Sequence, residues 1–397
     1  MTTLSPTDIT RAASVALALL LSAGIVKADN LSPDDLSGMT HIHEYAFTGA
    51  DIAEADIPEG VRYIGEAAFA GSSLNRINLP STLDSIGDYA FSQCADLVSV
   101  DLPRGIKHIG KKAFSGCTKL QTAAFPETLE NIDDEAFFNT AIADVDLSLC
   151  AGLASVGAWT FAQSPELTSV RLPQKSIVLG EGVFFGCRNL RSVTSATTEN
   201  LPDYMLAGSH GADASDLFGE GLVSIGSYCL SGNTALSNIT LPSTLDSLGD
   251  HSMERMTALA SIDATRLKSV PKTGENVWAE VDQPNVELTA APDMTAEFES
   301  APQWNEFHIA RFTSVDRPSM DTARLDVAIT STSIDLRADN SVITGVRLFD
   351  MRGAILMSAT PESPTCSLDI STLDRGTYVL AAVLKDAGQR SYTFIKQ

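Results

Sequence analysis

Basic residues are scarce in this sequence. Its 397 residues include 27 lysines and arginines against 50 aspartates and glutamates, which gives a formal net charge of −23. A nucleic-acid partner requires clustered positive charge that neutralises phosphates, and an anionic lipid surface requires the same. The composition therefore argues against a protein that binds nucleic acid or acidic membranes. Net charge says little about the fold, which has to be inferred from other features.

Long apolar segments are also missing, with one short exception near the N-terminus. The run from Val15 to about Val26 follows Arg11 and precedes small residues that end at Ala28. This order is typical of a secretory signal peptide with cleavage near Ala28, and no cysteine follows to carry a lipid. The alternative, a transmembrane anchor, needs about 20 apolar residues. We therefore expect residues 1–28 to be the signal peptide of an exported protein that is not an integral membrane protein.

Catalytic motifs are absent as well. The chain has no HExxH, no GxSxG, no glycine-rich phosphate loop and no zinc-spaced CxxC pair, and its scattered carboxylates do not define a glycosidase pair. Two groups of residues offer metal ligands: His41 with His43, and His210 with Asp213 and Asp216. Exposed residues at the edge of the fold and a solvated loop are the simpler interpretations. We expect no enzyme, and no catalytic, cofactor or metal site.

The sequence does contain a strong internal repeat. An aliphatic residue is followed five positions later by a large apolar one ten times, and successive pairs lie 22 to 24 residues apart. The pairs are Ile42/Phe47, Ile64/Phe69, Ile86/Phe91, Ile109/Phe114, Ile132/Phe137, Val156/Phe161, Leu179/Phe184, Leu201/Leu206, Ile225/Leu230 and Leu248/Met253. A unit this short cannot bury its apolar residues alone, so a fixed period predicts a solenoid whose coils complete one another's core. At the ~4.8 Å spacing of strands, ten coils span roughly 50 Å.

Each repeat unit divides into three parts. The first, such as LVSVDLP at 97–103, alternates inward and outward side chains and stops at a proline, which predicts a short strand. The second carries a glycine after the aliphatic residue, as at Gly65 and Gly87, where we expect a tight turn with positive φ. The third is a compact apolar turn such as DYAF at 88–91, which we expect to be helical. The predicted fold is mainly β: a solenoid of about ten 22–24-residue repeats, with one ribbon of short parallel strands along its side and helical turns.

The outward side chains of these strands form a candidate binding face, because solenoids contact their partners through such flat or concave surfaces. We call this surface the strand face. Its candidate binding residues are Arg76, Asn78, Ser99, Asp101, Asp144, Asp146, Ser169, Arg171, Asn238, Thr240 and Asp263. The same columns also hold Glu54, Asp56, Thr122, Ala124 and Ser261. Ordinary solvation of a polar surface is the open alternative, because these positions lack the aromatic and arginine enrichment of binding hot spots.

Two of the units carry a motif specific enough to suggest a family. LPSTLDSIGDYAFSQCADLVSV at 79–100 and LPRGIKHIGKKAFSGCTKLQTA at 102–123 closely resemble the BspA-like leucine-rich repeats of bacterial surface antigens, and the resemblance covers about 40–275. It implies a secreted or surface-exposed protein without an active site in its repeats. The implied function is adhesion or protein–protein interaction, with an extracellular protein or glycan as ligand. The alternative is a carbohydrate-binding or accessory surface protein of a polysaccharide-using system.

The pattern changes beyond the last regular repeat. We expect the leucine-rich-repeat solenoid to occupy 29–275, and a cap with a linker to occupy 276–313, because an open solenoid end exposes its core. Phe298, Trp304 and Phe307 are the aromatic residues expected to close this end. Similar Trp-Phe endings close BspA-like arrays.

From about residue 314 the 23-residue register gives way to alternating β segments. Six or seven short strands separated by Asp, Gly and Pro turns predict a small antiparallel β-sandwich over 314–397. VRLFDMRGAIL, LDISTLDRGTYVLAAV and the closing YTFIKQ resemble the C-terminal sorting domain of type IX secretion. Gly353, Leu373, Gly376 and Tyr378 fall on recurring positions of that family. The resemblance implies contact with the secretion machinery and a protein secreted or attached to the outer cell surface; a generic sandwich that binds or spaces is the alternative.

Six cysteines in an exported chain raise the question of disulfides. Cys94, Cys117 and Cys187 share one position in their repeats, so Cys94 and Cys117 would lie within disulfide reach in neighbouring coils. Small buried thiols are also ordinary core residues, and Cys187 has no such cysteine in an adjacent coil. We favour a column of reduced thiols, with a Cys94–Cys117 disulfide as the alternative.

Overall fold

The computed structural model describes residues 30–194, 198–310, 324–330, 332–339, 341–350, 354–385 and 388–396. Its contacts divide the chain into two compact units, Met1–Arg311 and Phe312–Gln397, which we describe one at a time. The predicted signal peptide, residues 1–28, lies outside the described residues. Within the described ranges, no helix combines the length and the apolar character needed to cross a membrane.

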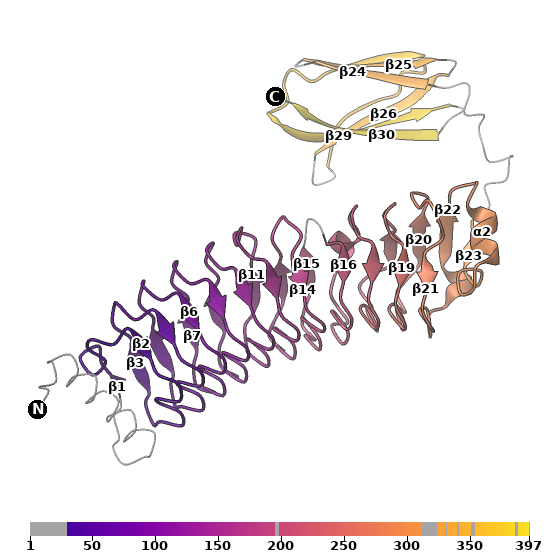
Figure 1. The fold of residues 1–397 in the computed structure, drawn as a ribbon. Helices are drawn as coiled ribbons and strands as arrows, with labels where there is room; N and C mark the ends of the chain where they lie inside the picture. Colours follow the sequence, from indigo (N-terminus) through magenta and orange to yellow (C-terminus); the bar gives the residue numbers. More distant parts are fainter. Residues whose placement is uncertain are drawn as a thin grey trace, which may run out of the picture. The chain divides into compact units, whose positions relative to one another are not determined.

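The first unit is a parallel β-solenoid of about twelve turns (Figure 1). Two ladders of short strands run along it, where the repeat pattern predicts one ribbon. The long-strand ladder consists of β1 (Asn30–Leu31), β3 (Glu54–Asp56), β5 (Arg76–Asn78), β7 (Ser99–Asp101), β9 (Thr122–Ala124), β11 (Asp144–Asp146), β13 (Ser169–Arg171), β15 (Ser192–Thr194), β18 (Asn238–Thr240), β20 (Ser261–Ala264), β22 (Glu287–Ala290) and β23 (His308–Ile309). The short-strand ladder consists of β2 (His41–Ile42), β4 (Tyr63–Ile64), β6 (Ser85–Ile86), β8 (His108–Ile109), β10 (Asn131–Ile132), β12 (Ser155–Val156), β14 (Val178–Leu179), β16 (Asn200–Leu201), β17 (Ser224–Ile225), β19 (Ser247–Leu248) and β21 (Lys272–Thr273).

The core of the solenoid is one continuous cluster that contains all ten predicted pairs. Each aliphatic member is the second residue of a short strand and is at most 9% exposed. The seven phenylalanines stack along the core, with successive ring centroids 5.1 to 6.0 Å apart and interplanar angles between 6° and 19°. The prediction that these pairs build a shared core is confirmed.

The glycine after the aliphatic residue is needed for a different reason from the one predicted. Gly65, Gly87 and their equivalents do not adopt positive φ, so that prediction is wrong. A Cβ on Gly65 would lie 2.6 Å from the backbone nitrogen of Glu44 and 2.8 Å from the carbonyl oxygen of Ile42 in the preceding coil. Glycine at this position therefore permits neighbouring coils to approach closely.

The compact turns form a third set of hydrogen bonds between coils. The N–H of Tyr45 donates to the carbonyl of Glu66 (2.8 Å) and that of Phe47 to the carbonyl of Ala68 (2.6 Å), and equivalent bonds recur along the solenoid. The turns also contain bonds between residues three apart, as helical turns do. A residue with positive φ in each turn, Tyr45 at 56° in the first coil, prevents continuation into a helix. The expected helical turns are therefore single turns that do not extend into helices.

Both strand ladders are interrupted. The long-strand ladder forms three sheets, which end at β9, at β15 and at the C-terminal end of the solenoid; the short-strand ladder breaks between β14 and β16. Pro202 explains the break in the short-strand ladder. In the next coil, the N–H of Gly226 donates to the carbonyl of Leu201 (2.8 Å), but Pro202 has no N–H to donate to Leu179.

The irregular stretch 186–224 still completes the solenoid. Ser192 forms a parallel bridge with Asp213, in place of the strand that the sequence pattern lacks there. A single turn of 3₁₀ helix, η1 (Ser215–Phe218), then buries Leu217 and Phe218 in the core. The core therefore continues through a coil whose sequence has lost the repeat motif.

The C-terminal end of the solenoid is closed by η2 (Gln283–Asn285), β22, α2 (Thr295–Ser300) and β23. The predicted capping residues Phe298, Trp304 and Phe307 are all buried. The side chain of Gln303 takes the place of a further coil: its carbonyl accepts a hydrogen bond from Val277 N (2.8 Å) and its amide donates to Gly274 O (2.7 Å). The buried aromatic rings therefore cover the core of the last coil, and the amide of Gln303 forms hydrogen bonds with its backbone.

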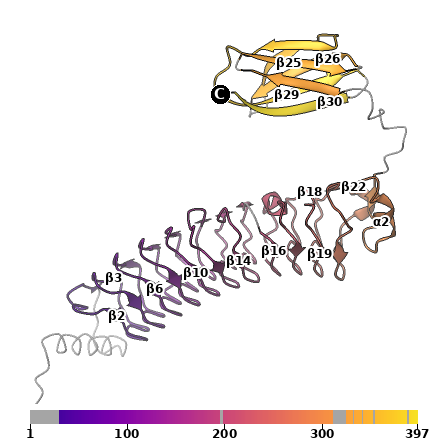
Figure 2. The same cartoon turned by 45° about the horizontal axis from the view of Figure 1, so that its top comes forward.

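The second unit consists of two antiparallel sheets around a separate core (Figure 2). One sheet has the order β24-β25-β28 and the other β27-β26-β29-β30. The strands are β24 (Arg324–Ile329), β25 (Ser333–Asp339), β26 (Ile343–Asp350), β27 (Ile355–Ala359), β28 (Thr365–Asp369), β29 (Gly376–Leu384) and β30 (Gly388–Lys396). The predicted small β-sandwich is confirmed. Gly353, one of the positions that resemble a sorting domain, lies outside the described residues.

Candidate binding face

The structure places all the predicted binding residues on one side of the long-strand ladder. Each is the first or third residue of its strand, where side chains point outward, while the middle residue, such as Ile77 at 5% exposure, is buried. The parallel register sets Asp144 beside Ser169 and Asp146 beside Arg171. The strand face is therefore made of columns, continuous within each of the three sheets and interrupted between them.

The two arginines of the strand face are paired with carboxylates of the preceding coil. The guanidinium of Arg76 lies 3.4 Å from Glu54 and 3.9 Å from Asp56, and that of Arg171 lies 3.3 Å from Asp146. Exposed pairs of this kind contribute little to stability. They do neutralise charge that a partner would otherwise meet.

Hydroxyl groups hold the two aspartates of β11. Ser169 Oγ donates to Asp144 (2.5 Å), while Ser148 donates to Asp146 through its hydroxyl (2.6 Å) and its N–H (3.0 Å). The Ser148 hydrogen bonds, followed by Arg171, hold the pKa of Asp146 below its usual value. Asp146 therefore remains ionised and fixed in orientation.

The remaining candidates differ in how much of their bonding capacity is free. Ser261 Oγ donates to Asn238 (2.7 Å), and Asp263 accepts a hydrogen bond from Thr265 N (2.9 Å). Asp101 is exposed, and its carboxylate makes no hydrogen bond or ion pair with the residues that the structure describes. Asp101 is therefore the strand-face carboxylate best placed to contact a partner.

Comparison with known proteins identifies the repeats. Residues 40–164 and 154–282 match the BspA type leucine rich repeat region, in six copies. These ranges span more than half of the chain. The chain belongs to the BspA-type leucine-rich-repeat family.

Several solved structures are similar to this chain, one of them with a TM-score above 0.5. A leucine-rich repeat protein from Bacteroides ovatus ATCC 8483 is 25% identical, with 72% of this chain and 76% of that chain covered and a TM-score of 0.58. The pneumococcal vaccine antigen PcpA is 21% identical over 61% of this chain and 68% of its own, with a TM-score of 0.41. A leucine rich cell surface protein from Faecalibacterium prausnitzii A2-165 is 19% identical, with 60% of this chain and 88% of that chain covered and a TM-score of 0.28. Among the curated proteins, none matches this chain.

The candidate metal ligands of this BspA-type protein do not form a site. The rings of His41 and His43 lie edge to face, 4.3 Å apart. His210 Nδ1 lies 2.8 Å from the carbonyl of Gly232, and Asp213 accepts a hydrogen bond from a backbone N–H. Across the described ranges, no group of three or more His, Cys, Asp or Glu side chains is placed to hold a metal ion.

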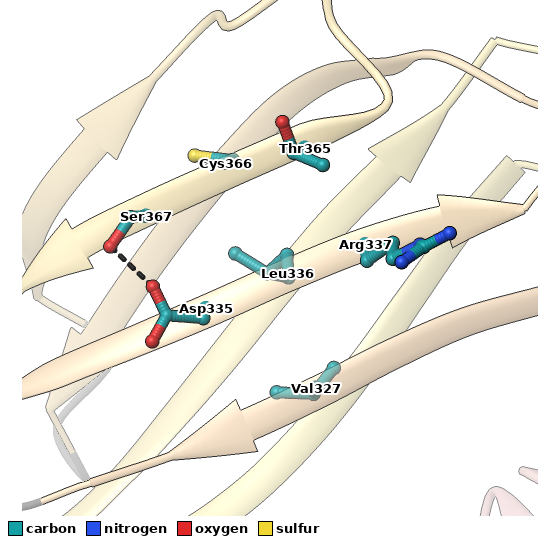
Figure 3. A pocket seen from close by; sticks show the side chains of 7 residues that line it. All are labelled: Val327, Asp335, Leu336, Arg337, Thr365, Cys366 and Ser367. Carbon is teal, nitrogen blue, oxygen red and sulfur yellow. Dashed lines mark hydrogen bonds between the residues drawn. The ribbon is translucent and has the colours of Figure 1, made fainter.

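An open depression of about 560 Å³ lies on the C-terminal unit (Figure 3). Its lining comes from β24, β25 and β28, and consists of Val327, Asp335, Leu336, Arg337, Thr365, Cys366 and Ser367. Ser367 Oγ donates to Asp335 (2.5 Å), and this bond together with one from Ser333 lowers the pKa of Asp335. Asp335 therefore stays ionised, which suits a hydrogen-bond acceptor and not a proton donor.

The thiols of the stacked cysteines donate hydrogen bonds to backbone carbonyl groups. The Sγ atoms of Cys94, Cys117 and Cys187 lie 3.0 to 3.1 Å from the carbonyl oxygen of a phenylalanine in the preceding coil. Ser209 occupies the same position in a later coil and makes the same bond (2.9 Å). All six cysteines of the chain are free in the structure. Burial raises the pKa of Cys94 to about 11 and that of Cys187 to about 12, so these thiols are inert at neutral pH.

Aromatic rings on the turns form a column that the periodic aliphatic and large apolar pairs do not by themselves identify. Trp159, Tyr204, Tyr228 and His251 each lie three residues after the aliphatic residue of their coil. The rings of Tyr204 and Tyr228 are 5.0 Å apart and those of Tyr228 and His251 are 4.7 Å apart, nearly parallel in both cases. The signal was present in the sequence as a shared repeat position, but Gly182 interrupts it.

Proposed function

We propose that this BspA-type protein is exported to the outer cell surface, where it acts as an adhesin or protein-interaction module without catalysis. Membership of the BspA-type family is the observation that supports this most strongly. The repeats also supply a long outward surface whose side chains vary from coil to coil, as an interaction scaffold requires. The proposed partner is an extracellular protein or glycan.

Capture of extracellular proteins by the immobilised full-length chain tests this function. Replacing Asp101 by Lys reverses the charge of an exposed strand-face residue, so it should weaken capture if the strand face is used. Glu166→Lys, which makes the same change at an exposed turn position outside that face, is the matched control. If the wild-type chain captures no extracellular protein or glycan, the interaction function is refuted.

We also propose that the C-terminal unit engages the secretion machinery. Leu373, Gly376 and Tyr378, which fall on recurring positions of the sorting-domain family, support this proposal; they lie at the start of β29 and in the turn before it. The last strand is tied to that turn by Lys396, whose ammonium donates to the carbonyls of Ile370 (2.6 Å) and Leu373 (2.7 Å).

Deleting residues 314–397 should abolish surface display while the solenoid remains folded and is exported across the inner membrane. Immunolabelling of intact cells, with fractionation of the periplasm, measures this. Normal display of the truncated chain contradicts a sorting role and favours a sandwich that binds or spaces.

A further inference from the structure

The aromatic column on the turns has the composition of a binding hot spot. We call this surface the aromatic turn face; it consists of Trp159, Phe185, Tyr204, Tyr228 and His251, all half-buried. Interface hot spots are enriched in Trp and Tyr. None of the predicted strand-face residues is aromatic. The turns therefore carry the aromatic side chains that the strand face lacks.

Trp159 is positioned by a glycine in the next coil. A Cβ at Gly182 would collide with Cε3, Cζ3 and Cδ2 of the indole, so the absence of a side chain lets the ring lie across that coil. The ring of Phe185 meets Trp159 edge to face with centroids 5.3 Å apart. Trp278 and Trp304 are 2% and 1% exposed, so Trp159 is the accessible one of the three tryptophans in the chain.

Carboxylates border the aromatic turn face. Four exposed acidic residues sit two positions after the aliphatic residue of their coils: Asp134, Glu181, Asp203 and Asp250. Asp134 accepts a hydrogen bond from Ala158 N (2.8 Å), which fixes one carboxylate beside Trp159. From the coil of Ile132 to that of Thr273, the three residues after each aliphatic position include no lysine or arginine. The charged side chains at these border positions are therefore acidic, whereas the arginines of the strand face neutralise part of the charge of that face.

We propose that the aromatic turn face binds a polypeptide segment that carries arginine or lysine. This rests on the proposed interaction function, and names its site and its class of partner. A guanidinium group stacks on the face of an indole ring and pairs with carboxylates, so a cationic segment uses both features of the surface. A neutral glycan could stack on the same rings but would leave the border charge uncompensated.

A synthetic peptide of alternating arginine and glycine, added to the full-length chain, tests the site. Because Trp159 is the accessible tryptophan, quenching of tryptophan fluorescence by acrylamide reports mainly on this position. The peptide should protect Trp159 from the quencher, and a serine–glycine peptide of equal length should not. The measurement belongs at about 0.15 M salt, where a Debye length of about 8 Å limits diffuse attraction to an acidic chain.

Variants at the column position test which surface is used. Asn276 occupies this position in a later coil with φ at 51°, so asparagine suits the backbone there. Tyr204→Asn and Tyr228→Asn should each weaken binding of the labelled peptide about tenfold, the loss expected for one aromatic contact in a hot spot. Glu181→Gln should weaken it about twofold to threefold. Tyr45→Asn, at the same position in the first coil, is the matched control and should leave affinity unchanged.

The outcomes separate this site from the wider function. Equal losses in Tyr45→Asn and Tyr204→Asn, with both variants folded by circular dichroism, overturn the site. So does protection of Trp159 by a glycan but not by the arginine peptide. If Asp101→Lys abolishes capture of extracellular proteins and Tyr204→Asn changes neither capture nor peptide binding, the interaction function stands and the aromatic turn face is excluded. If the wild-type chain captures no protein or glycan and the peptide fails to protect Trp159, both are refuted.

Discussion

The two units of this protein use β-structure in opposite ways. Strands of the solenoid are two to four residues long and pair in parallel from coil to coil, whereas those of the C-terminal unit are five to nine residues long and antiparallel. Their charge differs as sharply: residues 30–310 include 38 acidic and 15 basic residues, and residues 312–397 include 10 and 9. The acidity of the chain therefore belongs to the solenoid.

This difference shows where specific function can arise. Each coil contacts only its neighbours, so the stability of the solenoid is approximately a sum of similar terms, and its outward residues are free to vary. The sandwich depends on one closed core to which strands of both sheets contribute. A change in one coil should therefore act locally on the solenoid and leave the sandwich unaffected.

Removing one ring from the phenylalanine stack should have the largest effect. Phe114 is fully buried, with ring centroids 5.1 Å from those of both Phe91 and Phe137. Phe114→Ala should lower the free energy of unfolding of the solenoid by about 3–5 kcal/mol. Calorimetry should show the solenoid transition moving while the sandwich transition stays. Leu380→Ala, in the sandwich core, should move the sandwich transition and leave the solenoid transition in place. If either variant shifts both transitions together, the two units do not unfold independently.

Adding a methyl group should distinguish the glycines of the two units. Gly65→Ala places a Cβ against the backbone of the preceding coil and should destabilise the solenoid by about 1–3 kcal/mol, the cost of overpacking. Gly345 in β26 has its nearest obstacle, Val383, at 3.8 Å. Gly345→Ala should therefore be neutral or stabilise the sandwich by up to about 1 kcal/mol. If thermal melts show that Gly65→Ala and Gly345→Ala destabilise their units equally, the role of Gly65 is not to permit the close approach of neighbouring coils.

Two aspartates of the solenoid should respond to pH in opposite directions. Hydrogen bonds from Ser148 hold the pKa of Asp146 below its usual value, so its contribution to stability is present above an unfolded pKa of about 3.9 and is lost as the pH falls through the folded pKa. Burial raises the pKa of Asp133, against an opposing effect of His108. Ionisation of Asp133 therefore destabilises the fold as the pH rises above about 3.9.

Denaturant unfolding of Asp146→Asn and Asp133→Asn measures these contributions. At about pH 7, Asp146→Asn should lower the free energy of unfolding and Asp133→Asn should raise it, each by less than about 1 kcal/mol because both carboxylates are partly exposed. Both differences should become smaller as the pH falls through the titration range of the carboxylates and these groups become protonated in both states. The sandwich transition serves as the internal reference, and effects of the same sign in the two variants would contradict the assignment.

The regular part of the solenoid was predictable from the sequence because its core imposes a strict period. Every coil must bring an aliphatic residue such as Ile86 and a large apolar one such as Phe91 to the same depth. The strand face was predictable for a related reason: alternation of period two places Ser99 and Asp101 on the side opposite the buried Val100. The strands of the sandwich follow from the same alternation.

Features that depend on contacts between coils could not be predicted. A strand of two residues, such as β6, is too short to show alternation, so the periodic aliphatic residues did not identify a second ladder of strands. A glycine in a sequence is compatible with positive φ or with a close approach, and only the stacking of coils shows that Gly65 requires the second. The pairing of Arg76 with Glu54 depends on register across 22 residues. The aromatic turn face is dispersed in the same way, at one residue per coil.

The cysteines of the two units should differ in how fast they react with a thiol reagent. The five in the solenoid are buried, whereas Cys366 on β28 is only half-buried. Burial raises the pKa of Cys94 to about 11, so its thiolate is scarce at neutral pH, and Cys366 should react first with a thiol reagent in the native protein. Cys366→Ser should remove that fast phase. In denaturant all six thiols should react; a count of four, restored to six by reductant, would show that Cys94 and Cys117 form the alternative disulfide and that neither thiol donates to its phenylalanine carbonyl.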